Sequence, residues 1–153
     1  MTVSSAIDGD SLHHEQAASI QASDTFFVAS AHPLRGVDAS HRGGTPGFVE
    51  VVDERTLRIP DYVGNSLFNT LGNFTVNPHA GLVFLDFQRN RTLQLTGRAE
   101  ILWDREDTAG QTGGTQRFWD FRIDRWHESG THAGLRWKFL DYSPHNPQPA
   151  PAE

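Results

Sequence analysis

The stretch GLVFLDFQRNRTLQLTGRAEIL at residues 81–102 decides the fold class of this chain. Residues 81–87 form the most apolar run in the sequence, which predicts a strand at the centre of a sheet. The polar residues 88–90 predict a turn after this strand. Apolar and polar side chains then alternate from residue 92 to residue 102, as is typical of a strand with one buried face. The stretch therefore predicts two antiparallel strands that pair with each other.

Short runs of aromatic and β-branched residues on both sides of this hairpin predict further strands. These runs are residues 24–31, 37–41, 48–52, 56–59 and 119–126. Two other segments have a helical pattern. One is residues 11–22, with Ser11 as its N-cap, and the other lies between residues 62 and 78, with Leu67, Leu71 and Phe74 on one face. The pattern thus predicts a mainly β domain, a barrel or sandwich of six or seven strands with helical insertions.

Length and composition limit the class of protein. A chain of 153 residues has the size of one domain, and we expect an N-terminal tail and short helix at 1–23, a β domain at 24–147 and a disordered, proline-rich tail at 148–153. The formal net charge of -6 argues against a nucleic-acid-binding protein. Cysteine is absent, which excludes disulfides and thiolate chemistry. No apolar run reaches the ~20 residues of a membrane span and residues 1–10 lack signal-peptide character, so we expect a cytoplasmic protein.

Three segments carry groups that suit a phosphate or a planar ligand, and each also has a plain structural interpretation. Residues 40–48, SHRGGTPGF, are either an anion-binding turn or a flexible connection. Gly64, Asn65 and Ser66 open the second helix, where free N–H groups favour a phosphate, and an ordinary capped helix explains them equally well. The strand at 92–102 presents a polar row either to solvent or to a flavin: Thr92, Gln94, Thr96 and Arg98.

Other catalytic signatures are missing from the sequence. The eight histidines do not have the spacing of a zinc site, and there is neither a P-loop nor a G-x-S-x-G elbow. Asp61 reads as an isolated carboxylate with no evident partner. Kinase and serine-hydrolase functions therefore receive no support from the sequence.

Seven motifs in order along the chain resemble those of one known family. They are FFVAS at 26–30, SHRGGTPGFV at 40–49, DERTLRIPDYVGN at 53–65, N-x-x-G-N at 69–73, NPHAGLVFLDF at 77–87, RTLQLTGRA at 91–99 and LRWKFLDYSPHNP at 135–147. Each motif alone is weak, but together they resemble the pyridoxamine 5'-phosphate oxidase-like FMN-binding split barrels, in particular a bacterial branch of that family.

The resemblance implies a six-stranded antiparallel Greek-key split barrel. It also implies a homodimer in which two FMN molecules lie in clefts between the subunits. By this resemblance Ser40, His41 and Arg42 run beside the isoalloxazine, and Asn65, Asn69 and Thr70 lie near the phosphate. The remaining expected cofactor contacts are Arg91 and Gln94 on a neighbouring strand, and Arg136 and Trp137 reaching the flavin of the partner.

One departure from the family bears on the substrate. The authentic oxidase carries an arginine-lysine pair where Asn69 and Thr70 align, so the resemblance argues against pyridoxamine phosphate as the substrate. We therefore expect an FMN-dependent oxidoreductase in which backbone N–H groups or Arg42 stabilise the reduced ring. Two alternatives stay open: a non-catalytic module that binds flavin or haem, with His41 or a C-terminal histidine as a ligand of the haem iron, and a structural dimer without cofactor.

Overall fold

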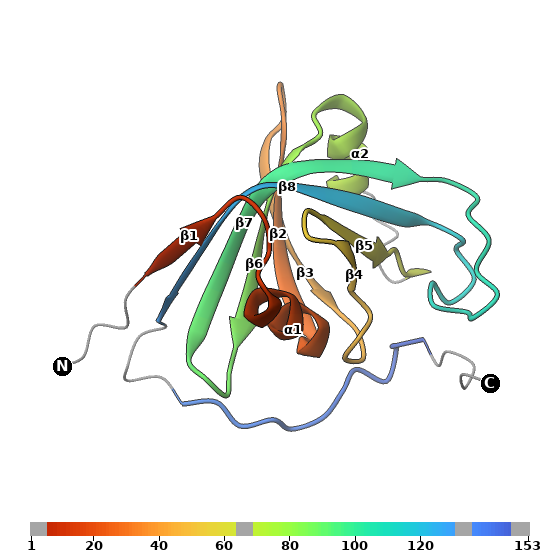
Figure 1. Cartoon of the computed structure of the whole chain (residues 1–153). Coiled ribbons are helices and arrows are strands. Elements are labelled where there is room, and N and C mark those ends of the chain that lie inside the picture. Colours follow the sequence, from red (N-terminus) through yellow and green to blue (C-terminus); the bar gives the residue numbers. More distant parts are fainter. Residues whose placement is uncertain (1–5, 64–68, 131–135, 148–153) are drawn as a thin grey trace.

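The computed structural model describes residues 6–63, 69–130 and 136–147, and Asn65 lies outside these ranges. In the described residues eight strands and two helices follow one another (Figure 1). Their bounds are β1 (Ile7–Gly9), α1 (His14–Ala22), β2 (Thr25–His32), β3 (Gly36–Gly43), β4 (Glu50–Asp53), β5 (Thr56–Pro60), α2 (Asn69–Val76), β6 (His79–Asp86), β7 (Arg91–Leu102) and β8 (Phe118–Gly130).

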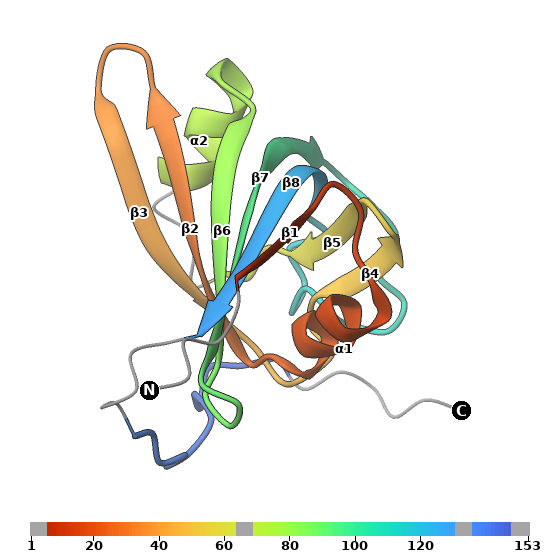
Figure 2. The same cartoon turned by 60° about the vertical axis from the view of Figure 1, so that its left-hand side comes forward.

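All strands belong to one antiparallel sheet with the order β3-β2-β6-β7-β8-β5-β4, and β1 pairs with β8. The sheet curls into a barrel, and β2 and β3 extend beyond it as a long hairpin (Figure 2). The predicted β class, the strand pairs and the split-barrel architecture are confirmed. The described residues contain eight strands rather than six. The strand β1 was not predicted, because its three residues are too few to show an alternation of apolar and polar side chains.

Large aromatic and aliphatic side chains fill the barrel. Phe26, Phe84 and Trp119 are at most 1% exposed, and the rings of Phe26 and Phe84 stack with centroids 5.1 Å apart. The alternation predicted for β7 is confirmed, because Leu93 and Leu95 are buried while Gln94 between them is exposed. This core fixes which face of each strand points inward.

Both helices bury one face against the sheet. Leu71 and Phe74 of α2 are buried as predicted, whereas Leu67 lies outside the described residues. The prediction of Ser11 as the N-cap of α1 was wrong, because the helix begins at His14 after His13. The carbonyl oxygen of Ser11 instead accepts a 2.8 Å hydrogen bond from Trp126 Nε1, which holds this residue outside the helix.

The described part of the C-terminal segment, residues 136–147, has no helix or strand and runs beneath the barrel (Figure 1). Its first aromatic side chain, Trp137, contacts the ring of Phe87 with centroids 4.9 Å apart. At its other end Pro147 lies next to Gly113 in the connection between β7 and β8. Among the described helices, neither is long and apolar enough to cross a membrane.

Candidate functional site

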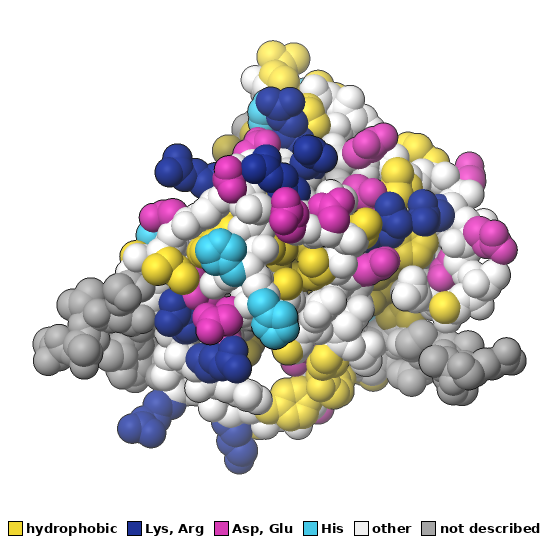
Figure 3. Space-filling view, viewed as in Figure 1, with side chains coloured by type: hydrophobic (Ala, Val, Ile, Leu, Met, Phe, Trp, Pro, Cys, Tyr) yellow, Lys and Arg dark blue, Asp and Glu magenta, His cyan; other side chains and the backbone are white. Residues whose placement is uncertain are grey.

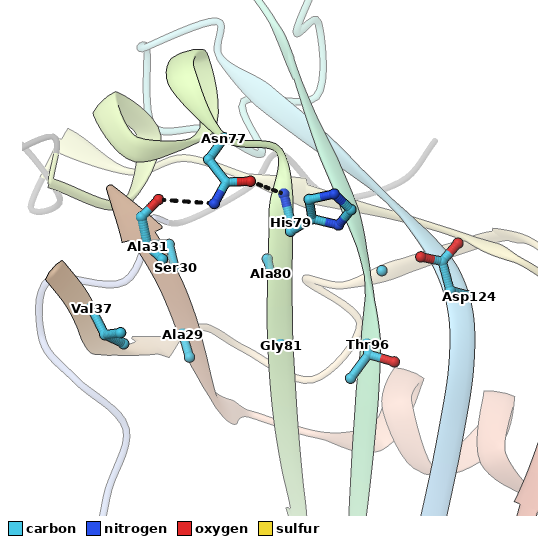
Figure 4. Close-up of a pocket in the computed structure, with 11 residues that line it drawn as sticks. Ala29, Ser30, Ala31, Val37, Asn77, His79, Ala80, Gly81, Thr96 and Asp124 are labelled. Carbon is cyan, nitrogen blue, oxygen red and sulfur yellow. Dashed lines mark hydrogen bonds between the residues drawn. The ribbon is translucent and has the colours of Figure 1, made fainter. Parts of the chain in front are cut away.

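A pocket of about 380 Å³ lies on the outer face of the sheet, the face that points away from the barrel core. Its lining residues come mostly from the neighbouring strands β3, β2, β6, β7 and β8, and Figure 4 shows them spread across the sheet. From β3 to β8 they include Val37, Ala29, Gly81, Thr96 and Asp124. Because the centre of the pocket is built from alanine and glycine, a flat ligand can approach the sheet closely at this place.

Polar groups stand around this pocket. His79 is one of its lining residues. The side chain of Asn77 links β2 to the start of β6 (Figure 4). Its Nδ2 donates to the carbonyl oxygen of Ala31 at 3.3 Å, and its Oδ1 accepts a hydrogen bond from the His79 N–H at 3.2 Å. Gln94 lies two residues from Thr96 on the same face of β7 and is exposed. Amide, hydroxyl and imidazole groups therefore surround an apolar floor, which is the usual composition of a ligand pocket.

A β-bulge directs Asp124 into the pocket. Thr96 pairs with Arg125 and Gly97 pairs with Ile123, so Asp124 is an extra residue in β8. The bulge depends on Gly97, since a Cβ atom there would collide with the carbonyl oxygen of Arg122. Bulges of this kind commonly turn a side chain toward a functional site. Sequence analysis missed Asp124, although a glycine inside an alternating strand is a recognised signal of a bulge.

The expected phosphate residue Thr70 is buried in a seam between α2 and β3. Its Oγ1 lies 3.0 Å from Ser40 Oγ and donates to Asp38 Oδ2 at 3.3 Å. Asn73 adds a 2.9 Å bond from Nδ2 to Ser30 Oγ in the same seam. The structure thus brings the predicted site residues Ser40 and Thr70 together on the inner side of the sheet, while the neighbouring Asn69 is exposed.

Arg42 and Asp61 form the most deeply buried charged group. Asp61 is 0% exposed, and its Oδ2 accepts a 3.1 Å hydrogen bond from Arg117 Nε. Its Oδ1 lies 3.7 Å from Nη1 of Arg42, with which it forms an ion pair. The expectation that Asp61 is an isolated carboxylate was therefore wrong, because both arginines come from sequence-distant strand ends that only the fold brings near. Burial lowers the pKa of Arg42, while the charges of Asp61 and Asp38 oppose that shift.

Arg91 and Gln94 lie on opposite faces of β7. Arg91 points inward and its Nη2 is 2.6 Å from Glu128 Oε1, a carboxylate that also accepts a 3.3 Å bond from Gln16 Nε2. Glu128 and Gln16 are buried, and sequence analysis singled out neither. Of the two predicted residues on this strand, only Gln94 stands on the pocket side.

The other predicted residues are spread around the molecule. His41 is exposed on the outer face, next to Phe27 and in short contact between its Nε2 and the hydroxyl of Thr25. Arg136 and Trp137 belong to the C-terminal segment and are exposed. Burial raises the pKa of Tyr62, which follows Asp61, to about 12. Within the described ranges no group of histidine and acidic side chains is arranged to hold a metal ion.

Charged side chains are mixed in sign on the face shown in Figure 3. Basic and acidic groups alternate there instead of gathering into a basic surface. This mixed distribution accompanies a formal net charge of -6 for the whole chain.

Comparison with known proteins gives a family match and several similar folds. The family model described as pyridoxamine 5'-phosphate oxidase matches residues 12–130. A search of curated proteins finds no match. Among solved structures, HupZ of Group A Streptococcus is similar with 15% identity and a TM-score of 0.59, covering 80% of this chain and 100% of its own.

Two further structures have the same fold. A Clostridium acetobutylicum protein of the pyridoxinephosphate oxidase family, related to general stress protein 26, has 13% identity and a TM-score of 0.53, covering 76% of this chain and 86% of its own. A FAD-binding protein of Mesorhizobium loti has 11% identity and a TM-score of 0.55, covering 84% of this chain and 99% of its own. At these identities the similarity concerns the fold.

Proposed function

The chain belongs to the pyridoxamine 5'-phosphate oxidase family, and on that premise we propose that it is an FMN-binding flavoprotein that acts as an oxidoreductase. Its substrate differs from pyridoxamine phosphate, since Asn69 and Thr70 replace the arginine-lysine pair of the oxidase. The flavin-binding neighbour from Mesorhizobium loti supports the ligand class.

The pocket on the outer face is the observation that carries this proposal. Its volume of about 380 Å³ falls within the range of roughly 300–1,000 Å³ that is usual for small-molecule sites. The floor around Ala29 and Gly81 admits a flat ring, and Thr96 in the lining offers a hydroxyl to its polar edge. Gln94 lies beside the pocket, two residues from Thr96 on the same face of β7, and can offer an amide. The residues present therefore fit the isoalloxazine.

The phosphate end of FMN finds fewer partners among the described residues. Asn69 is exposed and can donate its amide, but the hydroxyl of Thr70 already donates to Asp38 and Arg42 faces Asp61. The helix α2 that carries Asn69 and Thr70 packs on the inner side of the sheet, whereas the pocket lies on the outer face, so we assign neither residue to the phosphate. This arrangement predicts a site that holds the ring more firmly than the phosphate.

A second copy of the chain completes the site in this proposal. The pocket is open on the outer face, and apolar side chains are exposed near it or on the C-terminal segment, including Phe27 at 43% and Trp137 at 49%. Exposed aromatic groups are enriched where proteins associate. A homodimer that buries the outer face would cover the pocket and bring the C-terminal segment of one subunit toward the flavin of the other.

In this proposal the cofactor and the residues of the chain have different roles. FMN, when bound, supplies the hydride chemistry. The chain's own residues orient the ring through Gln94 and Thr96 and, in the dimer, exclude water from it. His79 and Asp124 border the same pocket and are positioned to contact a substrate that lies against the ring.

The proposal is tested by titrating the purified protein with FMN and following the flavin fluorescence. We expect quenching to a stoichiometry of one FMN per chain. Gln94→Ala should weaken binding about tenfold, the loss of roughly one hydrogen bond to a ligand. Glu100→Ala changes an exposed residue farther along the same face of β7 and serves as the matched control.

The outcomes separate the candidate functions. Saturable binding that Gln94→Ala weakens and Glu100→Ala leaves unchanged supports the flavin site on the outer face. Binding that both variants leave unchanged places the flavin elsewhere. If the protein does not bind FMN but shows a Soret band after addition of haem, it is a haem-binding module, and the proposal is wrong.

A further inference from the structure

Three basic side chains lie in register on the outer face of the sheet: His79 of β6, Arg98 of β7 and Arg122 of β8. Strand pairing places His79 directly opposite Arg98, and Arg98 directly opposite Arg122. All three are exposed. Residues directly opposite each other in an antiparallel pair have Cβ atoms about 4.5–5.5 Å apart, so the imidazole and the two guanidinium groups can reach a common ligand. We call these three residues the basic row.

The basic row departs from the usual rule for neighbouring strands. Like charges directly opposite each other destabilise a sheet. Among the residues that the structure describes, neither Arg98 nor Arg122 forms an ion pair, and Asp120 in the adjacent row is held by Arg58 through two hydrogen bonds of 2.8 Å. Arg122 acts on the exposed Asp53 only as the smallest of the causes that lower the pKa of that carboxyl. Departures of this kind from the local rules are expected at functional sites.

The basic row borders the pocket on the outer face. His79 and Gly97 line the pocket, and Arg98 follows Gly97 in β7. Figure 4 shows the imidazole of His79 directed from β6 toward β7. Along β7, Arg98 lies two residues, about 7 Å, from Thr96 in the pocket lining. A small molecule that lies on the floor of glycine and alanine can therefore extend to the two arginines.

The charge of Asp124 determines where an anionic group is stable in this pocket. Asp124 lines the pocket next to the β-bulge, in the part where Arg125 pairs with Thr96. A carboxylate repels an anion, whereas the guanidinium groups of Arg98 and Arg122 attract it. The two signs of charge thus orient a ligand, with its anionic group at the basic row.

We propose that the basic row is an anion-binding subsite of the pocket, in which Arg98 and Arg122 bind the phosphate group of a small molecule and His79 donates a further hydrogen bond. Guanidinium groups suit phosphate because their planar arrangement of N–H donors matches its oxygens. The phosphate group belongs either to FMN or to a second ligand, such as a nucleotide electron donor. The subsite itself does not depend on flavin binding.

Calorimetric titration of the full chain with inorganic pyrophosphate, at constant ionic strength, tests the subsite. We expect saturable binding of one pyrophosphate per chain. Arg98→Gln and Arg122→Gln should each weaken it about fivefold or more, because each removes charge-assisted hydrogen bonds. Arg105→Gln is the matched control, since it removes the same charge from an exposed arginine in the connection between β7 and β8, and it should change the affinity less than about twofold.

Thermal unfolding at low salt gives a second measurement. Without pyrophosphate, Arg98→Gln removes the repulsion between opposite arginines and should raise the Tm by about 1–3 °C. Pyrophosphate should then raise the Tm of the wild type more than that of the variant, because it binds the folded wild type more tightly.

FMN and riboflavin, which differ only in the phosphate, distinguish the two sources of the anion. If Arg98→Gln weakens FMN binding and leaves riboflavin binding unchanged, the subsite holds the phosphate of the flavin. If Arg98→Gln weakens pyrophosphate binding but neither flavin, the subsite holds the phosphate of a second ligand.

Three results would overturn the inference. One is a titration with pyrophosphate that does not saturate, and another is a loss with Arg105→Gln as large as that with Arg98→Gln, which would mean attraction by net charge alone. The third is a Tm that Arg98→Gln lowers, which would show that the arginine pair stabilises the fold. A protein that binds pyrophosphate as expected but binds no flavin would refute the proposed function and leave the subsite in place.

Discussion

Gly97 on β7 lies so close to Arg122 on β8 that a Cβ atom at position 97 would collide with the Arg122 carbonyl oxygen. The same Cβ would lie 2.9 Å from Cζ of Phe121 in the core. This approach allows the β-bulge that carries Asp124 to the pocket.

Gly97→Ala should therefore destabilise the protein by ~1–3 kcal/mol, as expected for overpacking a filled site. Urea unfolding followed by tryptophan fluorescence measures the change. Gly72→Ala is the control, because Gly72 is helical and a Cβ there meets nothing within 4 Å. It should stabilise the protein by ~0.5–1 kcal/mol. Equal effects of the two substitutions would contradict the close approach at Gly97.

Asp61→Ala should remove the link between the ends of β5, β3 and β8. Losing one partner of a buried ion pair costs ~3–5 kcal/mol, because the arginine charges left behind are poorly solvated. The free energy of unfolding in urea measures this loss. Asp141→Ala, a change at an exposed carboxylate of the C-terminal segment, is the comparison and should have little effect. A loss no larger than that of Asp141→Ala would show that the buried group contributes nothing to stability.

Phe27→Glu should disrupt the proposed dimer. It places a charge on the outer face at a side chain that is already 43% exposed in the single chain, so the fold itself should tolerate it. Light scattering after size-exclusion chromatography gives the mass, and we expect a dimer for the wild type and a monomer for the variant. Trp103→Glu changes another exposed aromatic, beyond the end of β7, and should remain a dimer. A Phe27→Glu dimer would exclude the outer face as the interface.

Asp107 should make stability depend on pH at the acid end. Burial acts to raise its pKa, but hydrogen bonds from Thr112, Gln111 and Gly110 outweigh this and lower the pKa below its usual value. A lowered folded-state pKa means that the unfolded chain binds the proton more tightly. The stabilisation is present above the unfolded pKa of ~3.9 and is lost as the pH falls through the folded value.

Melting temperatures between neutral pH and pH 3 test this dependence. Asp107→Asn should be less stable than the wild type at neutral pH, and the difference should shrink as the pH falls. Glu106→Gln removes the neighbouring exposed carboxylate and corrects for the change in net charge. A difference that stays constant over the whole pH range would contradict the role of Asp107.

Alternation along the strands made most of the fold predictable. In β7 it separated buried Leu93 and Leu95 from exposed Gln94 and Thr96, as the structure has them. It failed for β1, whose pairing with β8 depends on tertiary contact. The start of α1 was misplaced for a similar reason, since Trp126 holds Ser11 from 115 residues away in the sequence.

The candidate site was less predictable than the fold. Motifs indicate which segments belong together, but the face on which a side chain stands depends on register. His41 points outward while its neighbours Ser40 and Arg42 point inward, and one residue of spacing decides this. Asp61 forms ion pairs with Arg42 and Arg117, which are distant from it in the sequence, so no local sequence pattern could predict them.

The absorption spectrum of the purified protein, with identification of the chromophore that it releases on denaturation, tests the central claim most directly. The account predicts the two bands of a bound flavin, release of FMN, and bleaching of the bands when a nicotinamide reductant is added. A colourless protein that stays colourless after incubation with FMN would contradict it and would leave the family relationship as one of fold alone.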